Sequence, residues 1–433
     1  MTLYSENENY KLYQGNMLDM LEAIAPESID SIVTDPPYGL TSIVERFGKE
    51  NSAPAKGGKD GSFARLSRGF MGKEWDGSGI EYNVDAWRKC YKVLKSGGYL
   101  LAFGGSRTFH RIACAIEDAG FEIRDTIMWL YGSGFPKSMN IGLALDKKNG
   151  VESIDTGIPS QNARPNCDKT NTLYKSGTVG KTFTIKQAKN EWAGWGTALK
   201  PAYEPIIVAR KPFKGSCVDN VIKYGVGGIN IDECRIGDEE RTYRGMSSHK
   251  PEGAGTFRDD NWQPKDIEIT VSGRFPANVV LTYDETDDER LRYFYCAKAS
   301  KKDRDEGLDG FETKQCVGGG GGIGDYLKDV NSASGKFGSE KAPHKNTHPT
   351  VKPTSLMQYL VRLVTPNGGT VLDPFNGSGS TGKAVMYENA ERNKGYKYIG
   401  IELTEEYLPI AKARIENINV QPKKELTLFE EVV

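Results

Sequence analysis

The feature that most constrains the fold is an alternation of short apolar runs with amphipathic stretches in the first third of the chain. The runs at 29–34 (IDSIVT), 99–105 (YLLAFGG) and 121–131 (FEIRDTIMWLY) are typical of buried strands. Between them, 84–95 and 108–120 carry apolar residues at helical spacing, and the second stretch ends on a glycine. This order predicts an α/β fold in which helices flank a mostly parallel sheet.

The same alternation returns near the C-terminus. Residues 356–364 (LMQYLVRLV) have helical spacing. Residues 368–388 (GGTVLDPFNGSGSTGKAVMYE) predict a strand, a glycine turn and a helix, and 397–403 (KYIGIEL) predicts a strand that ends in an acid. The α/β core therefore resumes after an interruption.

The interruption divides the 433-residue chain into three regions. We expect the first part of the α/β domain at 1–138, an inserted and partly irregular region at 139–345, and the second part of the domain at 346–433. Within them, the glycine-rich, charged segment 44–80 has the composition of a mobile lid. The glycine run at 317–325 has the composition of a connector.

Composition excludes some classes of protein and favours others weakly. No run of eighteen apolar residues and no signal-peptide profile is present, so we expect no membrane span and a cytoplasmic location. Seven cysteines without a CxxC pair and only four histidines predict reduced thiols and no metal site. The net charge of −1 does not indicate a nucleic-acid partner, and the basic clusters at 209–215, 298–304 and 340–346 are weak signals singly.

A glycine loop follows the apolar strand in the C-terminal region. Phe375, Gly377 and Gly379 form F-x-G-x-G, where glycines let backbone N–H groups approach a ligand ahead of a helix N-terminus. Glu402 ends the next strand, where a carboxylate can accept bonds from the two hydroxyls of a ribose. An adenosine-containing cofactor fits. With Gly382 the loop also matches the dinucleotide pattern, so a nicotinamide or flavin cofactor and an ordinary tight turn remain open, whereas Walker A spacing is absent.

A second loop, DPPY, directly follows the strand at 29–34. The Asp35 carboxylate and the Pro36 carbonyl can together accept both hydrogens of a planar NH₂ group, which directs the nitrogen lone pair outward as a nucleophile. Pro37 stiffens the loop, and Tyr38 offers a ring face on which a heterocycle can stack. The alternative is a rigid polyproline turn. Ligands bind at the carboxyl ends of parallel strands, so the position of the loop favours a grip on an exocyclic base amine.

These motifs resemble a known family. DPPY (35–38) and DPFNGSG (373–379) match the hallmark pair of the S-adenosylmethionine-dependent DNA amino-methyltransferases, which methylate adenine N6 or cytosine N4. Their order, with HPTVKP at 348–353, is similar to the circularly permuted beta group. The stretch 196–212 resembles phage or prophage members. The resemblance implies a Rossmann-like methyltransferase fold, S-adenosylmethionine as cofactor, DNA as partner and a target-recognition region at 139–345.

The resemblance also implies roles for particular residues. The target amine would be bound and activated by the catalytic set Asp35, Pro36, Pro37 and Tyr38. The cofactor would be bound by Asn16, Asp35, His348, Thr350, Lys352, Asp373, Phe375, Asn376, Gly377, Gly379 and Glu402. One departure stands in GNMLDML (15–21), where Asn16 occupies the position of the family's acid, although its amide oxygen can still accept a hydrogen bond.

Several alternatives stay open within and beyond the family. Asp35 favours adenine, because the family's cytosine members usually begin this motif with serine, yet both bases present the same NH₂ group. A protein- or RNA-directed amino-methyltransferase shares the chemistry but resembles the unpermuted order. An oxidoreductase leaves DPPY unused, and a non-catalytic DNA-binding relative leaves Asp35 and Tyr38 unexplained. A homodimer is a further expectation from the beta group. A target base in duplex DNA would have to be extruded from the helix.

Overall fold

The computed structural model describes residues 2–39, 78–131, 138–159, 184–246, 266–281, 294–295, 298–313 and 345–418. The strands are β1 (Thr2–Glu6), β2 (Tyr10–Gln14), β3 (Ile29–Thr34), β4 (Leu94–Phe103), β5 (Glu122–Leu130), β6 (Ile154–Pro159), β7 (Thr184–Gln187), β8 (Tyr203–Arg210), β9 (Ile236–Met246), β10 (Asp266–Arg274), β11 (Val279–Leu281), β12 (Phe294–Tyr295), β13 (Thr370–Asp373) and β14 (Lys397–Glu402). The helices are α1 (Met17–Met20), α3 (Val84–Val93), α4 (Phe109–Asp118), α5 (Ile141–Lys148), α6 (Cys217–Tyr224), α7 (Lys301–Asp305), α9 (Thr354–Val364), α10 (Ser380–Arg392) and α11 (Leu408–Glu416), with short 3₁₀ turns η1 (Leu21–Ala23), η5 (Ile80–Tyr82), η6 (Asp232–Cys234) and η8 (Glu405–Tyr407).

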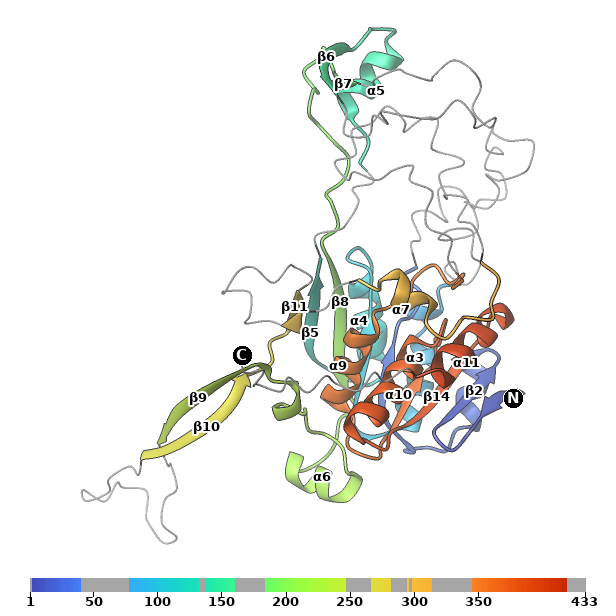
Figure 1. Ribbon diagram of the computed structural model, residues 1–433, viewed down its shortest axis with the longest axis vertical. Coiled ribbons are helices and arrows are strands. Elements are labelled where there is room, and N and C mark those ends of the chain that lie inside the picture. The colour runs from blue at the N-terminus through green and yellow to red at the C-terminus, as the bar shows by residue number, and fades with distance from the viewer. Residues whose placement is uncertain are drawn as a thin grey trace, which may run out of the picture.

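A ten-stranded sheet runs through the molecule in the order β1-β2-β14-β13-β3-β4-β8-β5-β11-β12. Neighbouring strands are parallel except at β1–β2 and on both sides of β8. The prediction of a mostly parallel α/β sheet is therefore confirmed. The two parts of the domain are interleaved in it, because β13 and β14 from the C-terminal part lie between β2 and β3 from the N-terminal part (Figure 1).

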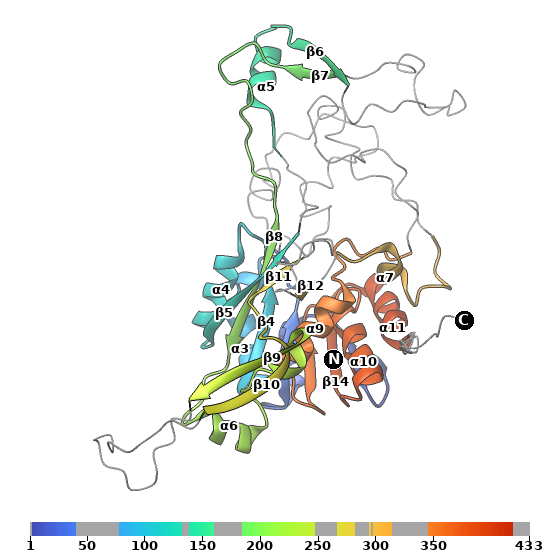
Figure 2. The same ribbon diagram turned by 60° about the vertical axis from the view of Figure 1, so that its left-hand side comes forward.

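Helices cover both faces of this sheet. Successive strand residues alternate between two apolar clusters: Leu100 packs in one and Leu101 in the other, as do Leu372 and Val371. One cluster includes residues of α9, α10 and α11, and the other includes residues of α1, α3 and α4. The two views show α9, α10 and α11 on the side of the strands opposite α3 and α4 (Figures 1 and 2). Burial on both faces explains why the parallel strands read as continuous apolar runs.

The expected elements match the structure closely, with one informative shift. β4 begins at Leu94 rather than near Tyr99, so the end of the stretch 84–95, which has helical spacing, already belongs to the strand. The pairing of β3 with β4 is irregular there, since Ile29 faces Leu94 whereas Ser31 faces Tyr99. Gly97 has φ of +85° in this irregularity, a conformation that glycine tolerates.

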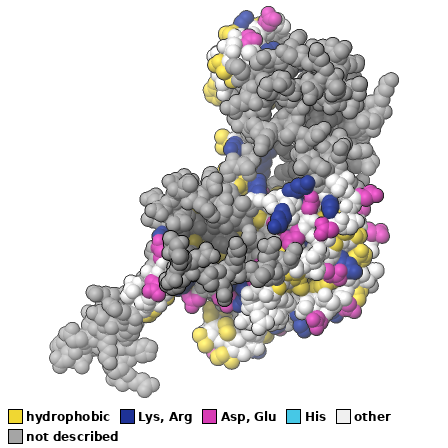
Figure 3. Space-filling view, viewed as in Figure 1, with side chains coloured by type: hydrophobic (Ala, Val, Ile, Leu, Met, Phe, Trp, Pro, Cys, Tyr) yellow, Lys and Arg dark blue, Asp and Glu magenta, His cyan; other side chains and the backbone are white. Residues whose placement is uncertain are grey.

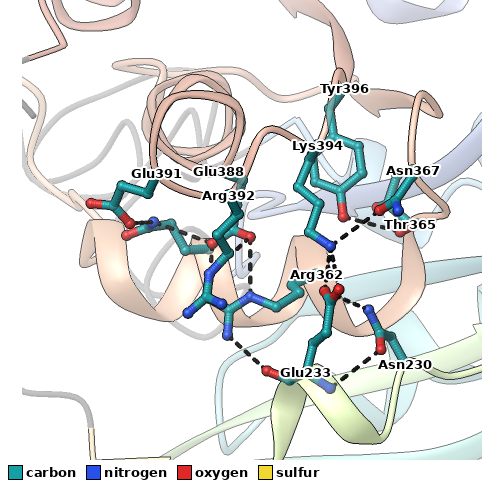
Figure 4. A network of polar contacts seen from close by, with 11 residues as sticks. Asn230, Glu233, Arg362, Thr365, Asn367, Glu388, Glu391, Arg392, Lys394 and Tyr396 are labelled. Carbon is teal, nitrogen blue, oxygen red and sulfur yellow. Dashed lines mark hydrogen bonds and ion pairs between the residues drawn. The ribbon is translucent and has the colours of Figure 1, made fainter.

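Several contacts fasten the region 139–345 to the body, including β11, which pairs with β5, and the three described next. β8 lies inside the sheet, antiparallel to β4 and β5. The carboxylate of Glu233, in η6, pairs with Lys394 Nζ at 2.5 Å, beside the bidentate pair between Arg362 of α9 and Glu388 of α10 (Figure 4). Near α7, Lys383 Nζ is buried and pairs with Asp303 Oδ1 at 2.8 Å.

Two parts of the same region extend away from the sheet. α5 stands beside the β6–β7 pair at one end of the molecule in both views (Figures 1 and 2). The β9–β10 ribbon projects from the other end. Most of the predicted lid, up to residue 77, and the glycine run at 317–325 lie outside the described residues. Within the described ranges, every helix is too short or too polar to cross a bilayer.

The Arg362–Glu388 pair generates a stability prediction. Arg362→Ala should lower the free energy of unfolding by about 3 kcal/mol, because Glu388 has a side chain with no exposed area and would lose its bidentate partner. Urea unfolding measures this loss. The control is Arg88→Ala, which breaks an exposed helical pair with Asp85 and should change stability little. Equal losses of stability in the two variants would show that the buried Arg362–Glu388 pair contributes no more than an exposed pair.

Candidate functional site

A cavity of about 440 Å³ opens where β3, β13 and β14 end. It is lined by residues from both ends of the chain, which the interleaved strands bring together. The sequence-predicted residues that line it are Asn16, Asp35, Pro36, Pro37, Tyr38, His348, Thr350, Lys352, Asp373, Phe375, Asn376, Gly377 and Glu402. Of the predicted set, Gly379 alone does not line the cavity.

The DPPY loop is held from its outer side. The Tyr38 carbonyl accepts hydrogen bonds from Thr108 Oγ1 at 2.6 Å and from the Tyr82 hydroxyl at 3.1 Å. The same Tyr82 hydroxyl donates to the Gly39 carbonyl at 2.8 Å. These bonds fix the backbone after the two prolines, so the loop is positioned without any ligand.

The Asp35 side chain is 18% exposed, and its two carboxylate oxygens differ in their surroundings. Lys352 Nζ donates to Oδ2 at 2.5 Å. Oδ1 is buried, and none of the described residues donates a hydrogen bond to it. Burial raises the pKa of Asp35, while the ammonium of Lys352 lowers it in part. One buried acceptor at the cavity is thus left for a donor from outside the protein.

Lys352 is buried between two carboxylates. Besides Asp35 it pairs with Glu204 Oε2 at 3.5 Å, and its Nζ lies 4.8 Å from the centre of the Phe103 ring. Burial lowers the pKa of Lys352, but the attraction of Asp35 and Glu204 outweighs it, so the net shift is upward. The amine of Lys352 is therefore charged.

Both oxygens of the Asp373 carboxylate bond within the protein. Its oxygens accept hydrogen bonds from Thr34 Oγ1 and Thr381 Oγ1, both at 2.6 Å, and from the Phe375 N–H at 3.0 Å. Burial raises its pKa to about 6 in spite of these bonds. Asp373 ties the end of β13 to β3 and to the start of α10.

Glu402 and Gly377 are linked directly. The Gly377 N–H donates to Glu402 Oε2 at 2.7 Å, and the Thr404 N–H donates to Oε1 at 2.8 Å. Burial raises the pKa of Glu402 to about 7, although both N–H groups lower it in part. Each oxygen keeps a further lone pair, so the carboxylate can still accept two bonds from a diol.

The two glycines of F-x-G-x-G have different surroundings. Gly377 has φ of +51°, and a Cβ there would stand 2.8 Å from His348 Nε2. Gly379 has φ of +74° and caps α10, where a Cβ would stand 3.0 Å from Ala411 Cα of α11. Gly377 therefore keeps the cavity wall thin, whereas Gly379 allows two helices to approach closely.

Asn376 and Asn16 both use their amides within the protein. Asn376 Oδ1 accepts from the Tyr398 hydroxyl at 2.7 Å, and its Nδ2 donates to the Gly377 carbonyl at 3.1 Å. Asn16 caps α1 by accepting from the Leu18 N–H at 3.0 Å. Both residues border the cavity, and both shape its wall through these bonds.

His348 is packed as a neutral ring. Burial lowers its pKa to about 3, and the nearby charges of Lys352 and Arg414 lower it further. The ring meets Tyr407 edge to face at 4.6 Å, and the backbone carbonyl accepts from Arg304 at 2.9 Å. A neutral imidazole next to Gly377 can contact a ligand by packing or by hydrogen bonding.

Sequence reasoning missed Glu204, which lines the cavity from β8. It stands in YEPIIVAR, and a charged side chain at the start of so apolar a strand is a signal that the residue has a special environment. Its partners come from distant loops, so periodicity alone does not reveal them. The assembled site combines a buried acceptor at Asp35, an aromatic ring at Tyr38 and a glycine loop with a carboxylate, which suits holding an amine beside a nucleoside.

Comparisons with known proteins point to one family. A family model described as DNA methylase matches residues 29–413. The type II methyltransferase M.HindIII of Haemophilus influenzae is 25% identical over 233 residues, which cover 51% of this chain and 64% of that enzyme. The type II methyltransferase M2.LlaDCHI of Lactococcus lactis subsp. cremoris is 28% identical over 265 residues, covering 57% of this chain and 87% of that enzyme.

A solved structure is also similar. The PvuII DNA methyltransferase (cytosine-N4-specific) superposes with a TM-score of 0.41 at 13% identity, covering 97% of this chain and 91% of that one. This likeness is too distant to inform the site.

Gly377 generates a prediction about stability. Gly377→Ala should lower the free energy of unfolding by about 3 kcal/mol, because the new Cβ combines a left-handed backbone with a clash against His348. Gly368→Ala is the matched control: its φ of +75° is similar, but its Cβ would meet nothing within 4 Å, so the loss should be about 1 kcal/mol. Denaturant unfolding distinguishes them, and equal losses would refute the clash.

Proposed function

This chain belongs to the DNA methylase family, and we propose that it transfers a methyl group from S-adenosylmethionine to the exocyclic amine of a base in DNA. The observation that carries the proposal is the buried Asp35 Oδ1, an acceptor left open at the same cavity as Gly377 and Glu402. An amine clamp (Asp35 and Pro36) and a nucleoside cradle (Gly377 and Glu402) thus line the same cavity.

The cofactor would lie along the glycine loop. Glu402 would accept bonds from the ribose hydroxyls, and Phe375 would pack against the adenosine. The thin wall at Gly377 provides room for the backbone to approach. His348 and Thr350 border the part of the cavity assigned to the amino-acid end. When bound, S-adenosylmethionine supplies an electrophilic methyl group on sulfur.

The chain's own part in the reaction is alignment. Asp35 Oδ1 and the Pro36 carbonyl would accept the two amine hydrogens, which turns the nitrogen lone pair toward the methyl group. Lys352 holds Asp35 through the other oxygen, so the open one keeps its direction. Tyr38 would stack on the base, a contact worth about 1–3 kcal/mol. No nucleophilic side chain is needed for this step.

DNA would approach the cavity over a basic rim. Lys298 is close enough to Glu204 and Lys352 for their charges to affect its pKa, and Lys301 and Lys302 are exposed at the start of α7. Lys and Arg side chains gather over α7 in the space-filling view (Figure 3). Such a rim can neutralise phosphates while the target base is extruded into the cavity. The remainder of the region 139–345 is assigned to target recognition.

Adenine N6 is the preferred target, on the ground that Asp35 begins the DPPY motif. Cytosine N4 is the second candidate, because both amines offer the same two hydrogens to Asp35 and Pro36. The motif order disfavours a protein- or RNA-directed enzyme, and the intact clamp disfavours a non-catalytic relative. The enzyme would act in the cytoplasm of a bacterial or phage-infected cell.

Methyl transfer is tested with labelled cofactor. The protein incubated with radiolabelled S-adenosylmethionine should label DNA and not protein or RNA, and hydrolysis of the product should give N6-methyladenine. Asp35→Ala should abolish transfer while S-adenosylmethionine binding measured by calorimetry stays nearly unchanged, because the amine clamp is lost and the cradle is kept. The control Asp118→Ala removes an exposed carboxylate at the end of α4 and should be fully active. Transfer by Asp35→Ala at the wild-type rate would refute the clamp.

The raised pKa of Glu402 predicts that cofactor affinity depends on pH. This pKa of about 7 means that the carboxylate becomes protonated between pH 8 and pH 6. Only the ionised form accepts bonds from both ribose hydroxyls, so the S-adenosylmethionine Kd should rise as pH falls below about 7. Glu402→Gln should bind weakly at every pH. Asp373, with a pKa of about 6, is a second group whose charge changes in this range. If the Kd of Glu402→Gln still shows the full pH dependence, the effect belongs to Asp373 instead of Glu402.

A further inference from the structure

Glu204 reaches the cavity from a strand that none of the recognised motifs includes. β8 is inserted antiparallel between β4 and β5, and Glu204 stands opposite Trp129 of β5. The pairing of β4 with β8 ends two residues before Glu204, at Phe103 opposite Ile206, and the Gly104 N–H then donates to the Pro205 carbonyl at 2.9 Å. Glu204 therefore lies just beyond the end of β4, at the cavity wall. Its side chain is 18% exposed.

Tyr38 and Lys352, the residue that pairs with Asp35, both contact a single oxygen of Glu204. The Tyr38 hydroxyl donates to Glu204 Oε2 at 3.0 Å, and Lys352 Nζ lies 3.5 Å from the same atom. The Lys352 side chain is only 7% exposed, so little water is available to replace either contact. Glu204 thus holds both the Tyr38 hydroxyl and the Lys352 ammonium in place.

We propose that Glu204 is a positioning residue for methyl transfer: it holds Lys352 and Tyr38 so that Asp35 keeps Oδ1 open for the target amine. This inference rests on the proposed function. Lys352 bonds to Asp35 through Oδ2 alone while Glu204 attracts it from the other side. Without that second carboxylate, the ammonium is free to bridge both oxygens of Asp35 and cover the acceptor. The Tyr38 ring would also lose the bond that sets its angle.

The kinetic test compares Glu204→Gln with Glu122→Gln. Glu122 of β5 pairs at 2.8 Å with Arg210, at the opposite end of β8, so its variant controls for the loss of a carboxylate that contacts this strand pair away from the cavity. Glu204→Gln should lower kcat for DNA methylation by about tenfold to a hundredfold, with the S-adenosylmethionine Kd within about twofold of wild type. Glu122→Gln should keep the wild-type kcat. Equal kcat values for both variants would overturn the proposal.

The pH profile separates positioning from simple packing. The charged and titratable groups around Asp35 are Lys352, Glu204, Tyr38 and Asp373. The negative charge of Glu204 raises the pKa of Asp35, so its removal should shift the acid limb of the kcat profile to lower pH. A packing defect lowers kcat without moving that limb, and an unmoved limb would therefore count against the proposal.

Tyr38→Phe provides a second variant should Glu204→Gln fail to fold. It removes only the hydroxyl that donates to Glu204, so it should lower kcat and leave cofactor affinity unchanged. In a double-mutant cycle the two substitutions should cost less together than the sum of their separate effects, and full additivity would overturn the coupling. A wild-type protein that labels no DNA would refute the proposed function itself, whereas an active wild type with an equally active Glu204→Gln refutes only this inference.

Discussion

The parallel pairing of β3 with β13 is the contact on which the site depends. It places Thr34 and Asp373, which are 339 residues apart in sequence, within 2.6 Å of each other, and the DPPY and glycine loops leave the sheet side by side. Closing so long a loop costs entropy that grows only slowly with length, so a large insertion between the two strands is tolerable. The apolar residues on both faces of the two strands supply the compensating burial.

Buried carboxylates at this cavity are stabilised in two different ways. Asp35 has a cation, Lys352, on one oxygen and nothing among the described residues on the other. Asp373 and Glu402 have no cation and rely on hydroxyl and N–H donors, which leave their pKa values raised to about 6 and about 7. At Asp373 and Glu402, burial without a counter-charge raises the pKa more than these hydrogen bonds lower it. The cavity therefore combines one carboxylate that is paired with a cation and two that are held by neutral donors.

Much of this arrangement could be predicted from the sequence. The strands and helices of both ends follow local periodicity. The prolines after β3 and the glycines after β13 indicated the two loops. Nonlocal features could not be predicted: the antiparallel insertion of β8, and the meeting of Glu204 with Tyr38, depend on which strands become neighbours. The motif also gives Gly379 the same apparent role as Gly377, whereas the structure gives it a helix contact. The roles assigned to individual residues at the cavity remain predictions.

The anchors of the region 139–345 have a consequence for how this region can vary in length. Strands β8 and β11, the Glu233–Lys394 pair and the Asp303–Lys383 pair fasten the region to the body at separate points. Chain between consecutive anchors can lengthen, shorten or be replaced without moving Glu204 or the cavity, since added loop residues cost little. Insertions and deletions in this region can therefore accumulate over evolution while the residues that line the cavity keep their positions.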